Sequence, residues 1–157
     1  MARSCKSKRL PAGHKINLTP IGVVRNSVNK SKHRDWQAVV SEIVINDELE
    51  AALDGLEGFS HLIVVYWMHK LPSPKEPPMK VHPKGDQSLP LTGVFATRSP
   101  TRPNPIGVTV VRLLRRHKNV LEVRGLDALN GTPVLDIKPY IPTHDSVNDA
   151  TIPQWLR

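Results

Sequence analysis

The sequence has one cysteine, few aromatic residues and no long apolar run. Cys5 alone forms no disulfide within the chain and excludes a multi-cysteine zinc site. The longest unbroken apolar stretch covers residues 62–68, far short of the ~20 residues that cross a bilayer. The basic first residues are followed by neither an apolar stretch nor a cleavage site, so they do not make a secretory signal. We therefore expect a cytoplasmic protein without a membrane span.

Acidic residues are missing from the start of the chain. Nine Lys and Arg residues precede the first acid, Asp35, whereas residues 35–157 hold 13 basic and 14 acidic side chains, so the excess behind the net charge of +8 lies at the N-terminus. We expect residues 1–17 to form a basic, flexible arm. Such an arm either neutralises the phosphates of a nucleic acid or is simply a solvated terminus, and charge alone does not decide between them.

The rest of the chain is rich in β-branched residues, and 39% of all 157 residues are apolar, which is enough for the core of one domain. Alternating and β-branched patterns predict seven strands. They cover residues 19–26, 37–46, 60–69, 91–97, 107–115, 120–126 and 134–141.

One helix is predicted over residues 47–56, where Asp47 and Glu50 have the spacing of a capping box. Asn130 and Gly131 form a tight-turn signal, which predicts that the strands on either side of it are antiparallel. Because helices do not alternate with strands, the pattern predicts an all-β fold, a closed or nearly closed antiparallel barrel of about seven strands.

Two further segments are predicted to lie outside the strands. Residues 70–90 contain six prolines and form a long surface loop, a kind of segment that often binds or covers a ligand. Residues 143–157 form a polar tail, and Trp155 suggests that the tail docks on the body of the protein.

The segment with the clearest chemistry is residues 94–107, VFATRSPTRPNPIG. Three prolines within six residues stiffen the backbone that carries Arg98, Arg102 and Asn104. The arginines can hold a carboxylate or a phosphate, and Asn104 can donate and accept hydrogen bonds beside them. The alternative is a rigid crossover whose arginines only bond backbone carbonyls.

Three motifs resemble the TsaA-like domain of the TrmO-type tRNA threonylcarbamoyladenosine methyltransferases. They are residues 94–107, residues 59–62 (FSHL) and residues 127–140 (DALNGTPVLDIKPY), in the family's order. The resemblance covers residues 18–142. It implies a single-sheet β-barrel that binds S-adenosylmethionine without a Rossmann fold, forms a homodimer, and methylates the amino nitrogen of threonylcarbamoyladenosine beside the tRNA anticodon.

The resemblance also implies where the cofactor lies. Seven residues match family positions that contact the cofactor, and we add Arg98 to these as a cofactor-binding residue. Those positions are Met68, His69, Val108, Gly125, Leu126, Asp127 and Ala128.

From residue chemistry we name Arg98, His69 and Asp136 as catalytic candidates, because His69 or Asp136 can take a proton from the carbamoylated nitrogen. Arg102 and Asn104 are assigned to substrate binding. Asp127 either accepts from the ribose hydroxyls or the methionine amino group, or closes the Asn-Gly turn. His69 also has a purely structural alternative, that of a hydrogen-bonding residue at a strand end.

The strand at residues 60–69 is apolar on both faces. One face carries Ile63, Val65 and Trp67, and the other carries Leu62, Val64, Tyr66 and Met68. A barrel covers one face, so a second subunit or the helix at residues 47–56 has to cover the other. We expect no metal, because the histidines lack ligand spacing and methyl transfer from a sulfonium needs none.

The chain departs from the family at two places. A Pro-Arg-Gln stretch that contributes to the cofactor site in many members is replaced by residues 33–37, HRDWQ, in which Gln37 is a possible substitute. Longer members also continue into a C-terminal region thought to help hold tRNA. Two alternatives therefore stay open: a methyltransferase of this fold acting on a small molecule, and a nucleic-acid-binding barrel without catalysis.

Overall fold

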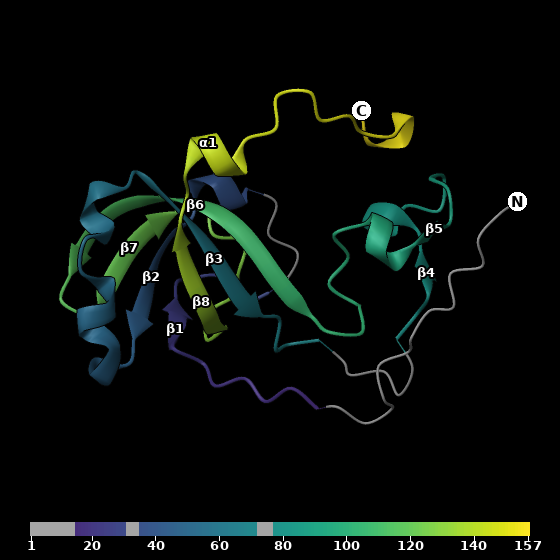
Figure 1. The fold of residues 1–157 in the computed structure, drawn as a ribbon. Coiled ribbons are helices and arrows are strands. Elements are labelled where there is room, and N and C mark those ends of the chain that lie inside the picture. Colours follow the sequence, from purple (N-terminus) through teal and green to yellow (C-terminus); the bar gives the residue numbers. More distant parts are fainter. Residues whose placement is uncertain (1–14, 31–34, 72–76) are drawn as a thin grey trace, which may run out of the picture.

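The computed structural model describes residues 15–30, 35–71 and 77–157, so most of the predicted basic arm lies outside the described residues. Six strands close into one antiparallel barrel in the order β1-β2-β7-β6-β3-β8 (Figure 1). These strands are β1 (Gly22–Arg25), β2 (Val40–Ile45), β3 (His61–Trp67), β6 (Ile106–His117), β7 (Val120–Arg124) and β8 (Pro133–Pro139). The predicted all-β barrel is confirmed, with six strands in the barrel.

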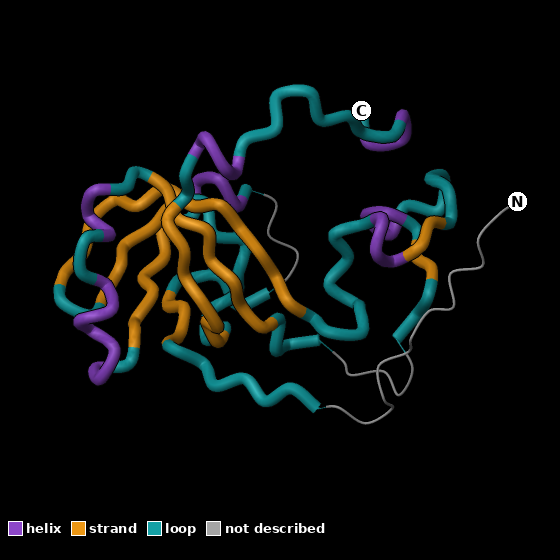
Figure 2. Tube along the Cα trace, in the orientation of Figure 1, coloured by secondary structure: helices purple, strands orange, loops and turns teal. Residues whose placement is uncertain are grey.

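The other elements are short. Strands β4 (Lys80–Val81) and β5 (Thr92–Gly93) form a separate two-stranded sheet beside the barrel, as Figure 2 shows. Helix α1 spans Pro142–Asp145, and the 3-10 helices span Trp36–Ala38, Asp47–Leu53, Leu56–Gly58, Pro83–Gly85, Val94–Ala96 and Gln154–Leu156. No helix in the described part of the chain is long and apolar enough to cross a membrane.

The prediction of a strand over residues 91–97 is mostly wrong. Only Thr92 and Gly93 are extended, and the chain then turns into the 3-10 helix Val94–Ala96. The hydroxyl of Thr97 donates to the carbonyl of Val94 at 2.8 Å and closes this turn. A hydroxyl that bonds the backbone locally competes with strand pairing, which the alternation of residue types does not reveal.

Strands β7 and β8 run antiparallel, as predicted, but they do not pair with each other. Gly131 does adopt the positive φ of a tight turn, +81°. However, the amides of Asn130 and Gly131 donate to the carbonyls of Val28 and Val24, each at 2.8 Å. The segment 125–132 therefore returns to β1 at one end of the barrel, and β8 pairs with β1 and β3 instead of β7.

The predicted helix at residues 47–56 forms as two 3-10 helices that close the opposite end of the barrel. Its capping box is absent, because Asn46 occupies the N-cap without a side-chain hydrogen bond, and Asp47 instead accepts from Asn119 Nδ2 at 2.8 Å. Leu53 belongs to the buried core, and Leu49 and Leu56 pack against it. These leucines face the barrel interior, so the helix does not cover the outer face of β3.

The alternation predicted for β3 is confirmed. Leu62, Val64 and Tyr66 are buried inside the barrel, whereas the outward residues of β3 are only partly buried. This strand therefore supplies both the centre of the core and an uncovered outer face.

The first half of β6 has one unpaired edge. Bonds from Met68 N to Pro105 O and from Leu113 N to Ser60 O place the odd-numbered residues of β6 toward β3. The backbone groups of Val108 and Val110 consequently point away from β3, and β7 pairs with β6 only from Arg112 onward. This open edge lies beside the segment 125–132.

Gly107 makes a close approach possible at the same point. A Cβ atom on Gly107 would overlap the ring of Tyr66, whose position is fixed inside the barrel. We expect Gly107→Ala to reduce the free energy of unfolding by about 1–3 kcal/mol, measured by denaturant titration, because the ring has to shift in a packed core. The control is Gly93→Ala, where a Cβ meets no atom within 4 Å. Equal stability of the two variants would contradict this packing argument.

Candidate functional site

The candidate site lies at the barrel end where β3 ends, β6 begins and the segment 125–132 follows β7. The side chain of Tyr66 connects these three elements. Its hydroxyl donates to the carbonyl of Asp127 at 2.5 Å and lies 3.1 Å from Thr109 Oγ1. Burial raises the pKa of Tyr66, so the hydroxyl keeps its proton and remains a donor at neutral pH.

In the predicted cofactor stretch, residues 125–128, two side chains point inward and that of Asp127 is exposed. Leu126 and Ala128 are buried in the core. The carbonyl of Leu126 accepts a hydrogen bond from Ala128 N at 3.0 Å. The carbonyl of Ala128 accepts one from Asn26 Nδ2 at 2.9 Å. The backbone amides of Leu126 and Asp127 have no partner among the described residues. This stretch therefore offers a ligand two amide donors and the carboxyl group of Asp127.

Gly125 brings Gln37 into the site. The backbone of Gly125 has a φ of +91°, and a Cβ there would lie 3.4 Å from Gln37 Oε1. Its amide donates to Val39 O at 3.0 Å, which joins the segment to the residues before β2. The amide side chain of Gln37, the predicted possible substitute in the family's first motif, thus lies beside the segment 125–132.

Arg98 and Asp127 form the charged part of the site. Burial raises the pKa of Asp127, and the guanidinium of Arg98 acts in the opposite direction. Arg98 Nη2 donates to the carbonyl of Val108 at 2.5 Å, on the open edge of β6. A cation, an exposed carboxyl group and the backbone of an unpaired strand edge are therefore close together.

His69 and Met68 follow directly from β3. Met68 packs against the buried core, and its amide donates to Pro105 O at 2.8 Å. The ring of His69 is near Gly131, because a Cβ there would lie 3.9 Å from His69 Nε2. Partial burial and then the ammonium of Lys70 lower the pKa of His69, which keeps the ring neutral at pH 7.

Arg102 and Asn104 lie on the stiff loop that leads into β6. Arg102 Nη1 donates to the carbonyls of Thr97 and Ser99, each at 3.4 Å. The side chain of Asn104 is exposed and has no hydrogen bond within the described part of the chain. Both arginines of the motif thus bond backbone carbonyls, but only Arg98 also lies near Asp127.

Asp136 is separated from this group because it belongs to the outer face of the barrel. It is opposite Val65 in the sheet, and its carboxylate pairs with Lys138 Nζ at 2.7 Å. The described residues contain no cluster of three or more His, Cys, Asp or Glu side chains suited to a metal ion.

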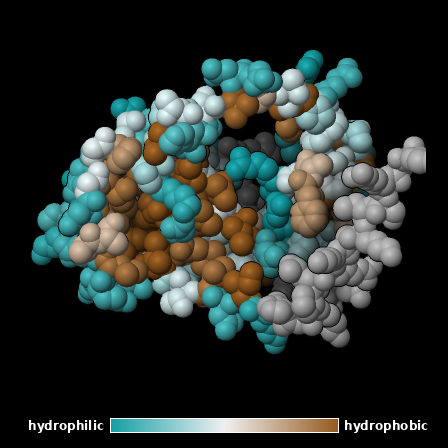
Figure 3. Space-filling view, in the orientation of Figure 1, coloured by the Kyte–Doolittle hydropathy of each residue, from teal (hydrophilic) through white to brown (hydrophobic). Residues whose placement is uncertain are grey.

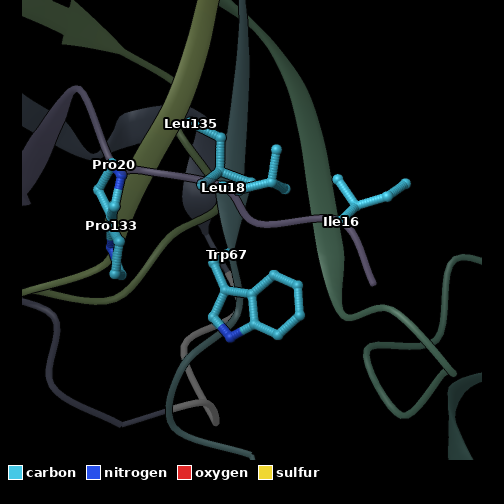
Figure 4. Close-up of a pocket in the computed structure, with 6 residues that line it drawn as sticks. All are labelled: Ile16, Leu18, Pro20, Trp67, Pro133 and Leu135. Atoms are coloured by element: carbon cyan, nitrogen blue, oxygen red, sulfur yellow. The ribbon is translucent and has the colours of Figure 1, made fainter. Parts of the chain in front are cut away.

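An apolar pocket of about 290 Å³ lies close to the same barrel end but on its outside (Figure 4). Trp67 from β3 points into it, together with Pro133 and Leu135 from β8. Ile16, Leu18 and Pro20 line the remaining side. None of the predicted cofactor residues lines this pocket, and it offers no charged group.

Sequence reasoning missed three residues that shape the site: Tyr66, Thr109 and Asn26. The only signal was a tyrosine inside an apolar strand, since a buried phenol requires a hydrogen-bond partner. Asn26 bonds Ala128 O and also donates to the buried Ser41 Oγ at 2.9 Å. Asn26 also accepts from Val28 N, but its bonds to Ser41 and Ala128 span 15 and 102 residues of sequence, so local patterns do not identify these partners.

Residues 29–146 of the chain match the model of a known family, the tRNA-methyltransferase O N-terminal domain. An S-adenosyl-L-methionine-binding protein of Archaeoglobus fulgidus is 46% identical over 135 residues, which cover 83% of this chain and 94% of that protein. A putative S-adenosylmethionine-dependent methyltransferase, RcsF of Pseudomonas aeruginosa, is 49% identical over 107 residues, 66% of this chain and 44% of that protein.

Solved structures similar to this chain come from the same family. A crystal structure of TrmO has a TM-score of 0.71 at 34% identity over 88% of this chain and 64% of that chain. A crystal structure of TrmO from Pseudomonas aeruginosa has a TM-score of 0.70 at the same identity. This chain spans only 37% of the length of another Archaeoglobus fulgidus relative, a probable S-adenosyl-L-methionine-binding protein that is 45% identical.

Proposed function

This chain belongs to the family of tRNA-methyltransferase O N-terminal domains, and from that premise we propose that it is an S-adenosylmethionine-dependent methyltransferase. We propose that its substrate is the amino nitrogen of threonylcarbamoyladenosine beside the tRNA anticodon. The observation that carries the proposal is the grouping of Arg98, Asp127 and the free amides of residues 126 and 127 beside the open edge of β6.

The chemistry of this group fits S-adenosylmethionine. The molecule carries a carboxylate, an ammonium group and a purine with acceptor nitrogens. Arg98 matches the carboxylate, Asp127 matches the ammonium group or the ribose hydroxyls, and the free amides match the purine nitrogens. Gln37, beside Gly125, adds a side-chain amide in the place of the family's first cofactor motif. Bound here, S-adenosylmethionine supplies an activated methyl group.

The residues of the chain then have to align the nucleophilic nitrogen and accept its proton. The lowered pKa of His69 supports it as the base, because a neutral ring has a free lone pair at pH 7. Asp136 is the weaker candidate, since its carboxylate is engaged with Lys138 on the outer face. Arg102 and Asn104 are assigned to the threonyl carboxylate or a phosphate of the substrate.

The proposal is tested first by isothermal titration with S-adenosylmethionine and S-adenosylhomocysteine, in buffer containing a chelator. We expect binding without added metal. Methyl transfer is then compared on tRNA with and without the threonylcarbamoyl group, and only the modified tRNA should accept the methyl group. Absence of heat with both compounds would overturn the cofactor assignment, and methylation of a small molecule but no tRNA would overturn the substrate.

Replacement of Arg98 by Ala should lower kcat/KM by roughly a hundredfold or more while the melting temperature changes little. A charge-assisted contact made in the transition state is worth a few kcal/mol, whereas this exposed side chain makes one hydrogen bond within the described residues. Arg98→Lys should recover part of the activity, because lysine keeps the charge but loses the planar fork. A large loss of melting temperature with full activity per folded molecule would assign Arg98 a structural role.

We also propose a homodimer. The outer face of the barrel at β3 and β6 is apolar, with Val108 43% and Val110 47% exposed next to Ile63 and Val65. In Figure 3 apolar side chains gather over this side of the barrel. The 3-10 helices at residues 47–58 face the interior, so they do not provide the cover that β3 lacks. A second copy of the chain is the remaining candidate.

The substitution Val110→Asp should therefore convert the dimer to a monomer, measured by light scattering at micromolar concentration. A charge at the centre of an apolar interface is left without a partner when the interface forms. The matched control is Val40→Asp on β2, because Val40 is 45% exposed and is not part of this face. A wild-type protein that is monomeric, or equal dissociation by both variants, would contradict the assignment.

A further inference from the structure

Charged side chains on the outside of the barrel are arranged in rows across the strands. In one row Arg25 on β1 is opposite Glu42 on β2, Glu42 is opposite Glu122 on β7, and Glu122 is opposite Arg115 on β6. Arg115 and Glu122 form an ion pair at 2.6 Å. Two arginines and two glutamates leave this row with no net charge.

The next row is different. Arg124 on β7 is opposite Arg112 on β6, and Arg112 is opposite His61 on β3. On the other side Arg124 is opposite Val40, which carries no charge. We call His61, Arg112 and Arg124 the arginine row. It has a charge of at least +2 and contains no carboxylate.

The arginine row is unfavourable for the isolated protein. Like charges that are directly opposite in a sheet repel each other. Arg112 and Arg124 are exposed, and neither forms an ion pair or a side-chain hydrogen bond with any described residue. Other arginines of the same two-strand region are neutralised: Arg116 pairs with Asp54 and Glu57 at 3.0 and 2.8 Å. Two adjacent guanidinium groups without a partner among the described residues can hold an anion by charge-assisted hydrogen bonds.

We propose that the arginine row binds the phosphodiester backbone of an RNA. This inference deepens the proposed function and rests on it, because it assigns a surface to the RNA that carries the modified nucleoside. It also differs from an interpretation in which the excess N-terminal charge alone holds the RNA. The row contacts backbone phosphates, so its contribution is independent of base sequence and of the threonylcarbamoyl group.

Two observations favour an RNA chain over a single small phosphate. Neighbouring strands are about 4.8 Å apart, so the row extends over roughly 10 Å of sheet from β3 to β7. At its β3 end the ring of Tyr140 lies 6.4 Å from the ring of His61, centroid to centroid. Extended positive charge next to aromatic rings is typical of surfaces that bind single-stranded nucleic acid.

The row is also continuous with the candidate site. Arg124 directly precedes the segment 125–128, whose amides and carboxyl group are assigned to the cofactor. Along β6, Arg112 is four positions after Val108, which is about 13 Å of strand. A nucleotide bound near Arg98 therefore has neighbours in the same RNA whose phosphates reach the row.

The test uses the full-length double variant Arg112→Gln/Arg124→Gln and an anticodon stem-loop RNA, with binding measured by fluorescence anisotropy at several salt concentrations. Loss of two phosphate contacts should reduce the slope of log K against log salt by about 1.4 to 1.8. The reduction should be the same for RNA with and without the threonylcarbamoyl group. Affinity for S-adenosylmethionine and the oligomeric state should not change.

The matched control is Arg25→Gln/Arg115→Gln, which removes the same number of charges from the neutral row. We expect its salt slope to stay close to that of the wild-type protein. Equal slopes for both double variants, an unchanged slope in the first, or an altered oligomeric state would overturn the inference. A reduced slope in a protein that transfers no methyl group would support the RNA surface and count against the proposed reaction instead.

Discussion

The hydroxyl of Tyr66 is the contact that joins the core of the barrel to its candidate site. It is buried inside the barrel, and a buried phenol that lacks a partner destabilises the fold. Its partners are the carbonyl of Asp127 and the hydroxyl of Thr109, so satisfying the core requirement also fixes residues 125–128. The close approach at Gly107 gives the ring its place. Packing and site geometry therefore depend on the same atoms.

That fixed segment lies beside a strand edge that the barrel leaves unpaired. Unpaired backbone groups on a strand edge attract other chains, and natural proteins usually cover or interrupt such edges. Here Arg98 covers the carbonyl of Val108. The other outward backbone groups of this edge have no partner strand, because β7 pairs with β6 only from Arg112 onward.

Much of the fold and part of the candidate site could be predicted from the sequence, because strand periodicity is local and the three motifs are long. The barrel, the two faces of β3 and the grouping of Arg98 with residues 125–128 rest on such patterns. The partners of β7 and β8 could not be predicted, since the Asn130-Gly131 signal describes a turn and says nothing about hydrogen bonds from that turn back to β1. The outer position of Asp136 follows from its register with Val65, which a motif does not encode.

The distribution of charge over the barrel also depends on strand register, which the sequence pattern does not reveal. The sequence contains a large excess of basic residues near its N-terminus and a nearly balanced remainder, which suggests a neutral barrel. Strand register divides that balanced remainder unevenly, because the glutamates of β2 and β7 are opposite Arg25 and Arg115 and leave Arg112 and Arg124 beside each other. A net charge near zero therefore coexists with a concentrated positive row. The register of the β6–β7 hairpin and of β3 against β6 therefore decides where positive charge is concentrated on the barrel.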